Sequence, residues 1–219
     1  AVKDLTEALS EQYDVTRIRL DGKIDALSSK TDGVTYRINN YEAAIIAKPD
    51  SAFSEKDLFI LDQFVMNGGR VLWAVDAMDP HLDSLRTHQF SMATPLELGL
   101  DNLFFAYGVR FNKNLLLDKL CSPIQVYTRP YGDQPRLETL PFPFQPLVVD
   151  SNNHPITANI DPVQLKMVGN IDTIGLDSAR STILLATSRY TRIMRNPVRV
   201  SLAVVDMDRT SLSRQITRF

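Results

Sequence analysis

Four side chains that could bind a ligand or transfer a proton follow the apolar segment 70–75 (RVLWAV). They are Asp76, Asp79, His81 and Asp83. Carboxylates and an imidazole at this spacing can hold a cation or act as an acid–base pair. The run D-A-M-D-P-H matches no tight metal-binding signature, so no metal ion is assigned. Asp76, Asp79 and His81 are therefore candidate ligand-binding residues, and a metal- or sugar-binding domain built on them stays open as an alternative.

Ser51 follows a second apolar segment, residues 41–47 (YEAAIIA). Both apolar segments are predicted to be buried strands of one sheet. Ligands of open α/β sheets bind at the carboxyl ends of the strands. Ser51 is therefore expected at the same rim as Asp76 and His81, and it is a further candidate ligand-binding residue.

The pair Gly68-Gly69 raises the question of a nucleotide site. Phosphate-binding glycine loops come after a strand and before a helix, where free N–H groups meet the anion. Here the glycines come after a predicted helix and before a strand. The pair therefore predicts the end of a helix, and no cofactor is expected.

Cys121 is the single cysteine, so no disulfide can form within the chain. Its surroundings, KLCSP, contain no nucleophile elbow. The histidines at 81, 88 and 154 have no nucleophile beside them in the sequence. Cys121 is interpreted as a half-buried structural thiol, and no catalytic residue is assigned. A hydrolase or amidotransferase-like enzyme using Cys121 with a histidine remains the alternative.

A strand–helix–strand unit must position these residues. Ser54, with Asp57 three positions later, is typical of a helix N-terminus. An apolar face follows, made of Leu58, Leu61, Phe64 and Val65. Such a unit implies a right-handed parallel crossover. The predicted fold class is therefore α/β, a mainly parallel sheet with flanking helices that is flavodoxin-like or amidotransferase-like, plus a Pro-rich excursion and C-terminal strands.

Weaker patterns place the remaining elements. Helices are expected at 2–13 and 95–107, and strands at 14–20, 34–38, 114–117, 183–187 and 198–205. Seven of the twelve prolines lie between residues 122 and 159, so this segment is expected to be extended and loop-rich. The predicted domains are an α/β core (1–120), a Pro-rich excursion or small sub-domain (121–160) and C-terminal strands completing the sheet (161–219), unless all three form a single domain.

Charge is distributed unevenly along the chain. The net charge is −2, yet residues 180–219 contain eight arginines and two aspartates. This basic segment could face anionic lipid or an acidic partner, or it could be solvated surface. A nucleic-acid partner is not expected, because the chain as a whole is acidic. Neither a membrane span nor a signal peptide is visible, and the chain resembles a fragment of a longer protein.

One stretch resembles a known family. Its pattern is a strand ending in Pro49, a helix capped by Ser54, a turn at Gly68-Gly69 and an apolar strand ending in Asp76, in YEAAIIAKPDSAFSEKDLFILDQFVMNGGRVLWAVD. The later segment FPFQPLVVDSNNHPITANI is also similar. The chain resembles, over roughly 13–190, the extracytoplasmic domain of gliding-motility-associated ABC transporter proteins of the GldG type, within the auxiliary family of ABC-type uncharacterized transport systems.

The resemblance implies a non-enzymatic auxiliary or solute-binding component of an ABC transport system. Its expected partners are the permease and ATPase subunits, on the periplasmic face of the inner membrane, with membrane anchorage by segments outside this chain. It implies no catalytic residue, no cofactor and no particular solute.

Overall fold

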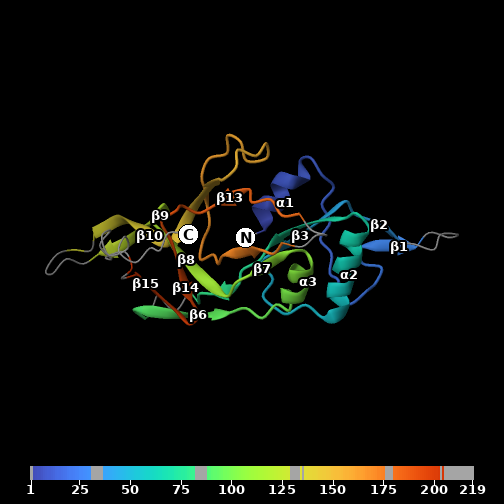
Figure 1. Ribbon diagram of the computed structural model, residues 1–219, viewed down its shortest axis with the longest axis horizontal. Helices are drawn as coiled ribbons and strands as arrows, with labels where there is room; N and C mark the ends of the chain where they lie inside the picture. Colours follow the sequence, from blue (N-terminus) through green and yellow to red (C-terminus); the bar gives the residue numbers. More distant parts are fainter. Residues whose placement is uncertain are drawn as a thin grey trace. The chain divides into compact units, whose positions relative to one another are not determined.

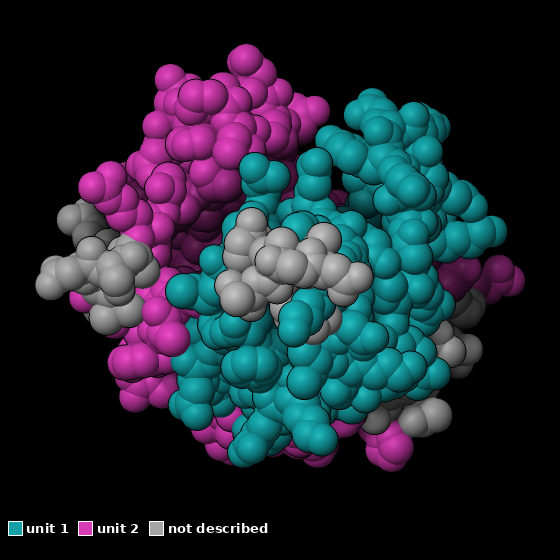
Figure 2. Space-filling view, turned by 90° about the vertical axis from the view of Figure 1, so that its right-hand side faces the viewer, with its two compact units in different colours: residues 1–75, 97–103 teal, residues 76–96, 104–219 magenta. Residues whose placement is uncertain are grey.

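The computed structural model describes most of the chain, namely residues 2–30, 37–81, 88–128, 134, 136–175, 180–202 and 204. The chain divides into two compact units, coloured separately in Figure 2. Unit 1 comprises residues 1–75 and 97–103, and unit 2 comprises residues 76–96 and 104–219. These bounds differ from the three predicted domains, which remain a prediction.

The elements of unit 1 are short, apart from one helix of three turns. In chain order they are α1 (Lys3–Ser10), β1 (Ser28–Lys30), β2 (Arg37–Asn39), β3 (Ala43–Ala47), α2 (Glu55–Met66) and β4 (Arg70–Ala74).

The elements of unit 2 are almost all strands. They are β5 (Met78–Asp79), β6 (Phe90–Pro95), β7 (Val109–Phe111), β8 (Asn114–Asp118), β9 (Cys121–Thr128), β10 (Arg136–Asp150), β11 (Val163–Gln164), β12 (Ile171–Thr173), β13 (Leu185–Ala186), β14 (Thr191–Arg195) and β15 (Val198–Ser201). The short helix α3 (Asp101–Ala106) spans the boundary between the units in sequence. Among the described helices, none has the length and apolar character needed to cross a bilayer.

The predicted strand–helix–strand unit is confirmed in unit 1. Strands β3 and β4 pair in parallel, and α2 connects them (Figure 1). The Ser54 side chain accepts a hydrogen bond from the Asp57 N–H and so caps α2. The helix buries Ile60, Leu61 and Phe64 against apolar side chains of both strands. Local capping and one apolar helix face therefore suffice to specify this part of the fold.

The expectation that both strands are buried on both faces is wrong. Burial alternates along β3 and β4, and only one face packs under α2. On the opposite face Ile45 and Leu72 are neighbours across the pair, and both are exposed. The apolar run 41–47 is typical of a central strand, but in the described part of the chain β3 pairs with β4 alone.

The N-terminal predictions have a mixed outcome. The helix expected at 2–13 is confirmed as α1, which buries none of its residues. The strand expected at 14–20 is wrong, because this segment is irregular and largely exposed. Of the strand expected at 34–38, the last positions belong to β2, which pairs antiparallel with β1. Residues 31–36 lie outside the described residues.

The predicted fold class is wrong for unit 2 and for the chain as a whole. The β3–β4 pair is parallel, whereas every other strand pair described is antiparallel. A parallel pair needs a long crossover, usually a helix, and α2 is the one helix that serves this purpose among the described elements. The chain is therefore mostly antiparallel strands, not a flavodoxin-like parallel sheet.

Much of the described Pro-rich segment is strand, and part of it lies in the core. Residues 136–150 form β10, which pairs with β9 over much of its length and with β11 and β13 near its end (Figure 1). Proline lacks an N–H but tolerates extended backbone, so the prolines shape the strand without preventing it. Phe142 and Phe144 are buried in the main core of unit 2. The prediction of an extended segment is confirmed over residues 122–128 and 136–150, which are strand and not loop. Residues 151–159 form bends and turns, as expected of a loop-rich segment, and 129–133 and 135 lie outside the described residues.

The core of unit 2 joins strands that are distant in sequence. It contains Met78, Ala93, Leu115, Leu117, Phe142, Phe144, Met167, Val198 and Val200. Strands predicted at 114–117, 183–187 and 198–205 are present as β8, β13 and β15, although part of the last range lies outside the described residues. The helix predicted at 95–107 is confirmed only over α3, because the chain before it is the end of β6 and an irregular stretch.

Candidate functional site

The structure brings two of the predicted ligand-binding residues together beside β5. The Asp79 Oδ2 atom lies 3.2 Å from His81 Nδ1. The other carboxylate oxygen accepts a hydrogen bond of 2.9 Å from the His81 backbone N–H. His81 has a positive φ of 45°, an uncommon conformation outside glycine. The Asp79 carboxylate thus contacts both the ring and the backbone of His81.

Two hydroxyl side chains from β6 complete this group. His81 Nε2 lies 2.9 Å from Thr94 Oγ1, and Thr94 is the cross-strand partner of Asp79. Ser91 Oγ donates to the His81 carbonyl at 3.1 Å. In the tautomer that carries its proton on Nδ1, beside the carboxylate, Nε2 is free to accept a hydrogen bond from the Thr94 hydroxyl. We call Asp79, His81 and Thr94 the histidine cluster.

The order carboxylate, imidazole, hydroxyl is the order that activates a nucleophilic hydroxyl in hydrolases. In the histidine cluster, however, the side chains of Asp79 and His81 are 44% and 46% exposed. Water therefore competes for each group and weakens the electrostatic coupling between them. The geometry suits the binding of a small polar ligand at the surface better than a water-excluded catalytic centre.

The histidine cluster as described contains none of the other predicted site residues, Asp76, Ser51 and Asp83. Asp76 is half-buried and already interacts with another residue. Ser51 donates to the neighbouring Asp50 carboxylate at 2.8 Å and belongs to unit 1. A common rim for Ser51 and His81 therefore stays a prediction. Asp83 lies outside the described residues.

Metal binding has no built site within the described ranges. No group of three or more His, Cys, Asp or Glu side chains is placed there to hold an ion. Asp79 and His81 supply two such ligands, whereas a structural zinc site uses four.

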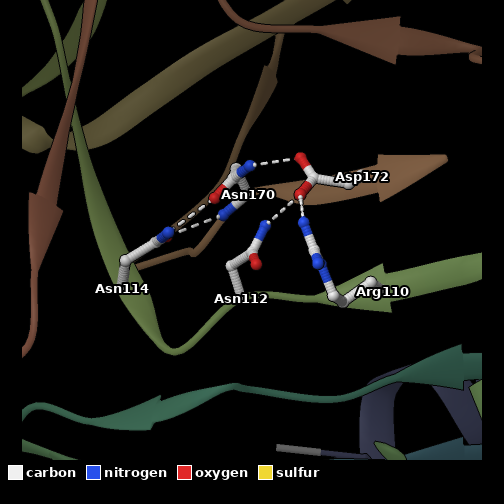
Figure 3. A network of polar contacts seen from close by, with 5 residues as sticks. All are labelled: Arg110, Asn112, Asn114, Asn170 and Asp172. Atoms are coloured by element: carbon white, nitrogen blue, oxygen red, sulfur yellow. Dashed lines mark hydrogen bonds and ion pairs between the residues drawn. The ribbon is translucent and has the colours of Figure 1, made fainter. Parts of the chain in front are cut away.

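A larger polar network, which the sequence did not predict, joins β12 to the β7–β8 turn (Figure 3). Asp172 is its centre. One carboxylate oxygen accepts from Arg110 Nη2 and Asn112 Nδ2, each at 2.8 Å, and the other accepts from Asn170 Nδ2 at 2.9 Å. The Arg110 hydrogen bond, with the Asn112 bond next, lowers the pKa of Asp172 from its ordinary value. The carboxylate is therefore held ionised.

The network continues through a pair of asparagines. Asn114 Nδ2 donates to Asn170 Oδ1 at 2.6 Å, and the Asn170 N–H donates to Asn114 Oδ1 at 3.1 Å. Gly169 lets the chain pass this close, because a Cβ there would lie 2.8 Å from the Asn114 carbonyl oxygen. The members hydrogen-bond one another, so the network acts as a clamp on the β7–β8 turn.

A second unpredicted polar centre is Asp118, which is fully buried at the end of β8. Its oxygens accept hydrogen bonds from the N–H groups of Leu120 and Ser188 and from the hydroxyls of Ser188 and Thr191. Four donors offset the cost of removing the carboxylate from water. Asp118 therefore joins the β8–β9 turn to the turn that precedes β14.

The sequence contains an unspecific signal for the Asp172 network and none for Asp118. The spacings N-x-N at 112–114 and N-x-D at 170–172 are typical of turns. Their partners are separated by 56 to 62 positions, which no local pattern can connect. The donors to Asp118 from the second turn are 70 and 73 positions away.

The thiol and His154 occupy ordinary structural positions. Cys121 is half-buried at the start of β9, opposite Pro146. His154 Nδ1 accepts a hydrogen bond from the Ile156 N–H, within one turn. Whether Cys121 is a reactive nucleophile stays a prediction to be tested.

Comparison with known proteins places the chain at the level of a family. No curated protein and no solved structure matches it. The family model described as "ABC-type uncharacterized transport system" matches residues 1–217. This match covers both units and agrees with the resemblance seen in residues 41–76. The chain therefore belongs to the family of auxiliary components of ABC-type uncharacterized transport systems.

Proposed function

We propose that this chain is a non-catalytic, extracytoplasmic component of an ABC transport system that acts by binding other proteins. The observation that carries the proposal is the family match, which extends from residue 1 to residue 217. Membership supports a role as an auxiliary transport component. The binding role, the location and the absence of catalysis are our inference.

The polar centres of unit 2 support a non-catalytic role. Asp118 and Asp172 each have three or four donors directed at their oxygens, all from the same chain. A carboxylate used in proton transfer needs an oxygen within reach of the substrate. These two carboxylates instead hold turns together, so the best-organised polar groups of the described chain serve its structure.

The proposed partners are the permease and ATPase subunits encoded with this protein, and the proposed location is the periplasmic face of the inner membrane. The test is affinity purification of the full-length protein from detergent-solubilised membranes. We expect both subunits to co-purify, and an unrelated permease serves as the control. Their repeated absence after mild cross-linking contradicts the proposal.

A link to gliding motility is a finer proposal that rests on the resemblance of residues 41–76. Deletion of the coding gene in a gliding bacterium is expected to stop colony spreading, and a plasmid copy to restore it. Normal spreading of the deletion strain would separate this protein from motility while leaving the transport role intact.

Ligand binding at the histidine cluster is the second candidate, because the structure brings Asp79 and His81 together with Thr94. A ligand that binds only the folded protein raises its melting temperature. A thermal-shift screen with divalent cations and a glycan panel is expected to show a hit that Asp79→Asn abolishes and Asp161→Asn, an exposed control, retains. A flat screen removes this candidate.

The enzyme alternative depends on Cys121. A catalytic thiol needs a depressed pKa and therefore reacts quickly with alkylating agents near neutral pH. We expect Cys121 to react no faster than a free thiol such as glutathione. A much faster reaction, reversed by substitution of one of the histidines, would favour a cysteine-dependent hydrolase.

A further inference from the structure

Two turns of unit 2 present a pair of cations around one aromatic ring. Lys119 lies in the turn after β8, and Arg189 and Tyr190 lie in the turn before β14. The Lys119 Nζ atom is 5.2 Å from the centre of the Tyr190 ring, and the Arg189 Cζ atom is 4.9 Å from it. Both distances suit cation–π attraction. The ring therefore holds two positive charges at one place on the surface.

The four side chains of these turns are all exposed, including two that are largely apolar. Leu120, next to Lys119, is 41% exposed, and Tyr190, next to Arg189, is 42% exposed. Each turn thus pairs a cation with an apolar or aromatic neighbour. We call Lys119, Leu120, Arg189 and Tyr190 the cationic tip.

The buried Asp118 carboxylate holds the two turns in place. It accepts from the Leu120 N–H at 2.8 Å in the first turn and from the Ser188 N–H at 2.7 Å in the second. Ser188 Oγ then accepts from the Tyr190 N–H at 3.1 Å. Because the anchor is fully buried, little conformational entropy remains for the tip backbone to lose on binding.

The two cations of the tip have no acidic partner in the described part of the chain. The ion pairs described there involve other residues, and Tyr190 is the contact that both cations share. Asp118 is close in sequence, but its oxygens are occupied by its four donors. The positive charge of Lys119 and Arg189 is therefore available to an external anion.

We propose that the cationic tip docks on a membrane surface that carries anionic phosphate headgroups. The cations bind headgroup phosphates, the Tyr190 ring lies at the headgroup level, and Leu120 enters the edge of the acyl layer. An acidic protein segment would satisfy the cations but would leave the exposed leucine without a matching apolar layer. The lipid interface satisfies both kinds of side chain.

This proposal rests on the proposed location at a membrane. It adds a lipid contact made by residues of the 219-residue chain itself. The expected binding is weak, because the tip has two cations and each contributes only about a fivefold gain in partitioning to an anionic surface. In a protein held at the membrane by other segments, such a contact orients the domain instead of recruiting it.

The test is co-sedimentation of the 219-residue chain with sucrose-loaded vesicles at low salt. Vesicles of phosphatidylcholine alone are compared with vesicles containing about one third phosphatidylglycerol. We expect binding only to the anionic vesicles, with loss of binding at high salt as screening increases. The double variant Lys119→Ala with Arg189→Ala is expected to reduce the partition coefficient about thirtyfold.

A matched control removes the same charge elsewhere. Arg17 and Lys23 are exposed cations of unit 1, so Arg17→Ala with Lys23→Ala changes the net charge equally. This variant is expected to bind like the parent chain. Tyr190→Ala is expected to weaken binding several-fold, whereas Tyr13→Ala, at a tyrosine that is 65% exposed, has no effect.

Three outcomes overturn the proposal. They are equal binding to neutral and anionic vesicles, equal loss in the tip variant and its matched control, and binding to polyglutamate without binding to vesicles. The last result would assign the tip to an acidic protein. Failure here with successful co-purification of the permease would leave the proposed function standing and remove the lipid contact alone.

Discussion

The two units of this protein are stabilised by contacts of very different sequence range. In unit 1, α2 packs on the two strands that it connects. In its first turn, Asp57 accepts a hydrogen bond from the Gly22 N–H, 35 positions earlier. In unit 2, β8 pairs with β14, where Asp118 contacts Thr191 over 73 positions, and Ser201 bonds to the Gln89 carbonyl over 112. The core of unit 1 is thus formed by elements that follow one another in sequence, and that of unit 2 by distant strands.

This difference determines which kind of residue holds each unit together. An apolar helix face can be satisfied by adjacent strands, so the centre of unit 1 is the fully buried Phe64. Antiparallel strands from distant segments must be held in one register, and polar side chains with directional bonds achieve this. The centres of unit 2 are therefore Asp118 and Asp172 as much as its apolar core.

The strongest test of the comparison is Phe64→Ala, expected to lower the free energy of unfolding by about 3–5 kcal/mol because it leaves a cavity. Trp73, the single tryptophan, packs against the same core, so its fluorescence reports unit 1 during urea unfolding. Phe59→Ala, on the same helix at 55% exposure, is the control and is expected to have little effect. If circular dichroism and fluorescence midpoints shift together, the units unfold as one and the contrast fails.

The counterpart in unit 2 is Asp118→Ala, expected to cost about 2–4 kcal/mol because it leaves several buried donors without an acceptor. The strand signal in circular dichroism should be lost at lower urea, while the Trp73 midpoint changes little. Asp161→Ala, at an exposed position of the same unit, is the control. A shift no larger than that of the control would show that the buried carboxylate is not the register-holding group.

A smaller effect separates the two glycines after α2. A Cβ at Gly69 would collide with the buried Phe64 ring, so Gly69→Ala is expected to cost about 1–3 kcal/mol through overpacking. Gly68 has a positive φ of 87° and open space around it, so Gly68→Ala costs only about 1 kcal/mol of backbone strain. Trp73 fluorescence in urea measures both. The reverse order would show that the turn, not the packing, limits this end of the helix.

The smallest expected effect is at the N-terminus of α2. Ser54→Ala removes the cap and is expected to cost about 1 kcal/mol at neutral pH. The Ser54 hydroxyl is the main cause of the lowered pKa of Asp57. A lowered folded-state pKa contributes stability above the unfolded pKa of about 3.9, and this contribution is lost as pH falls through the folded value.

The difference between the parent chain and Ser54→Ala should therefore shrink as the pH falls below about 4. The hydroxyl stabilises ionised Asp57 in the folded parent chain, and this gain is lost when Asp57 is protonated. Urea unfolding followed by Trp73 fluorescence across this range measures it. A difference that stays constant into acid would mean that the cap acts through the Asp57 N–H alone, a bond of 3.2 Å that does not depend on charge.

The same contrast explains what could be predicted from the sequence. The signals for α2, β3 and β4 lie within one continuous stretch, so their existence, order and parallel pairing were predicted correctly. The prediction of a parallel sheet for the rest of the chain is wrong, because the other described strand pairs are antiparallel. The apolar run of β8 and the alternation of β15 each predict a strand but carry no information on its partner, which sets the sheet type.

The candidate site follows the same rule. Asp79 and His81 are two positions apart, and their proximity was predictable, whereas Thr94 joins them only through the register of β5 with β6. Asp172 has only a turn-like spacing around it, and Asp118 has no local sign of its role. Asp118 follows a run of leucines, and its buried carboxylate is hydrogen-bonded by Ser188, which lies in a distant turn.

The long pair of β9 and β10 has a mechanical consequence. Pro123 lies opposite Pro141, and the register shifts between Pro141 and Pro146. Neither member of the proline pair has an N–H, so neither can donate a cross-strand hydrogen bond there. Beyond it, Tyr127 and Leu137 face each other in an exposed ribbon. Under a pulling force applied at its outer end, the ribbon should unzip in a short first step to the proline pair, while the part anchored by Phe142 and Phe144 resists.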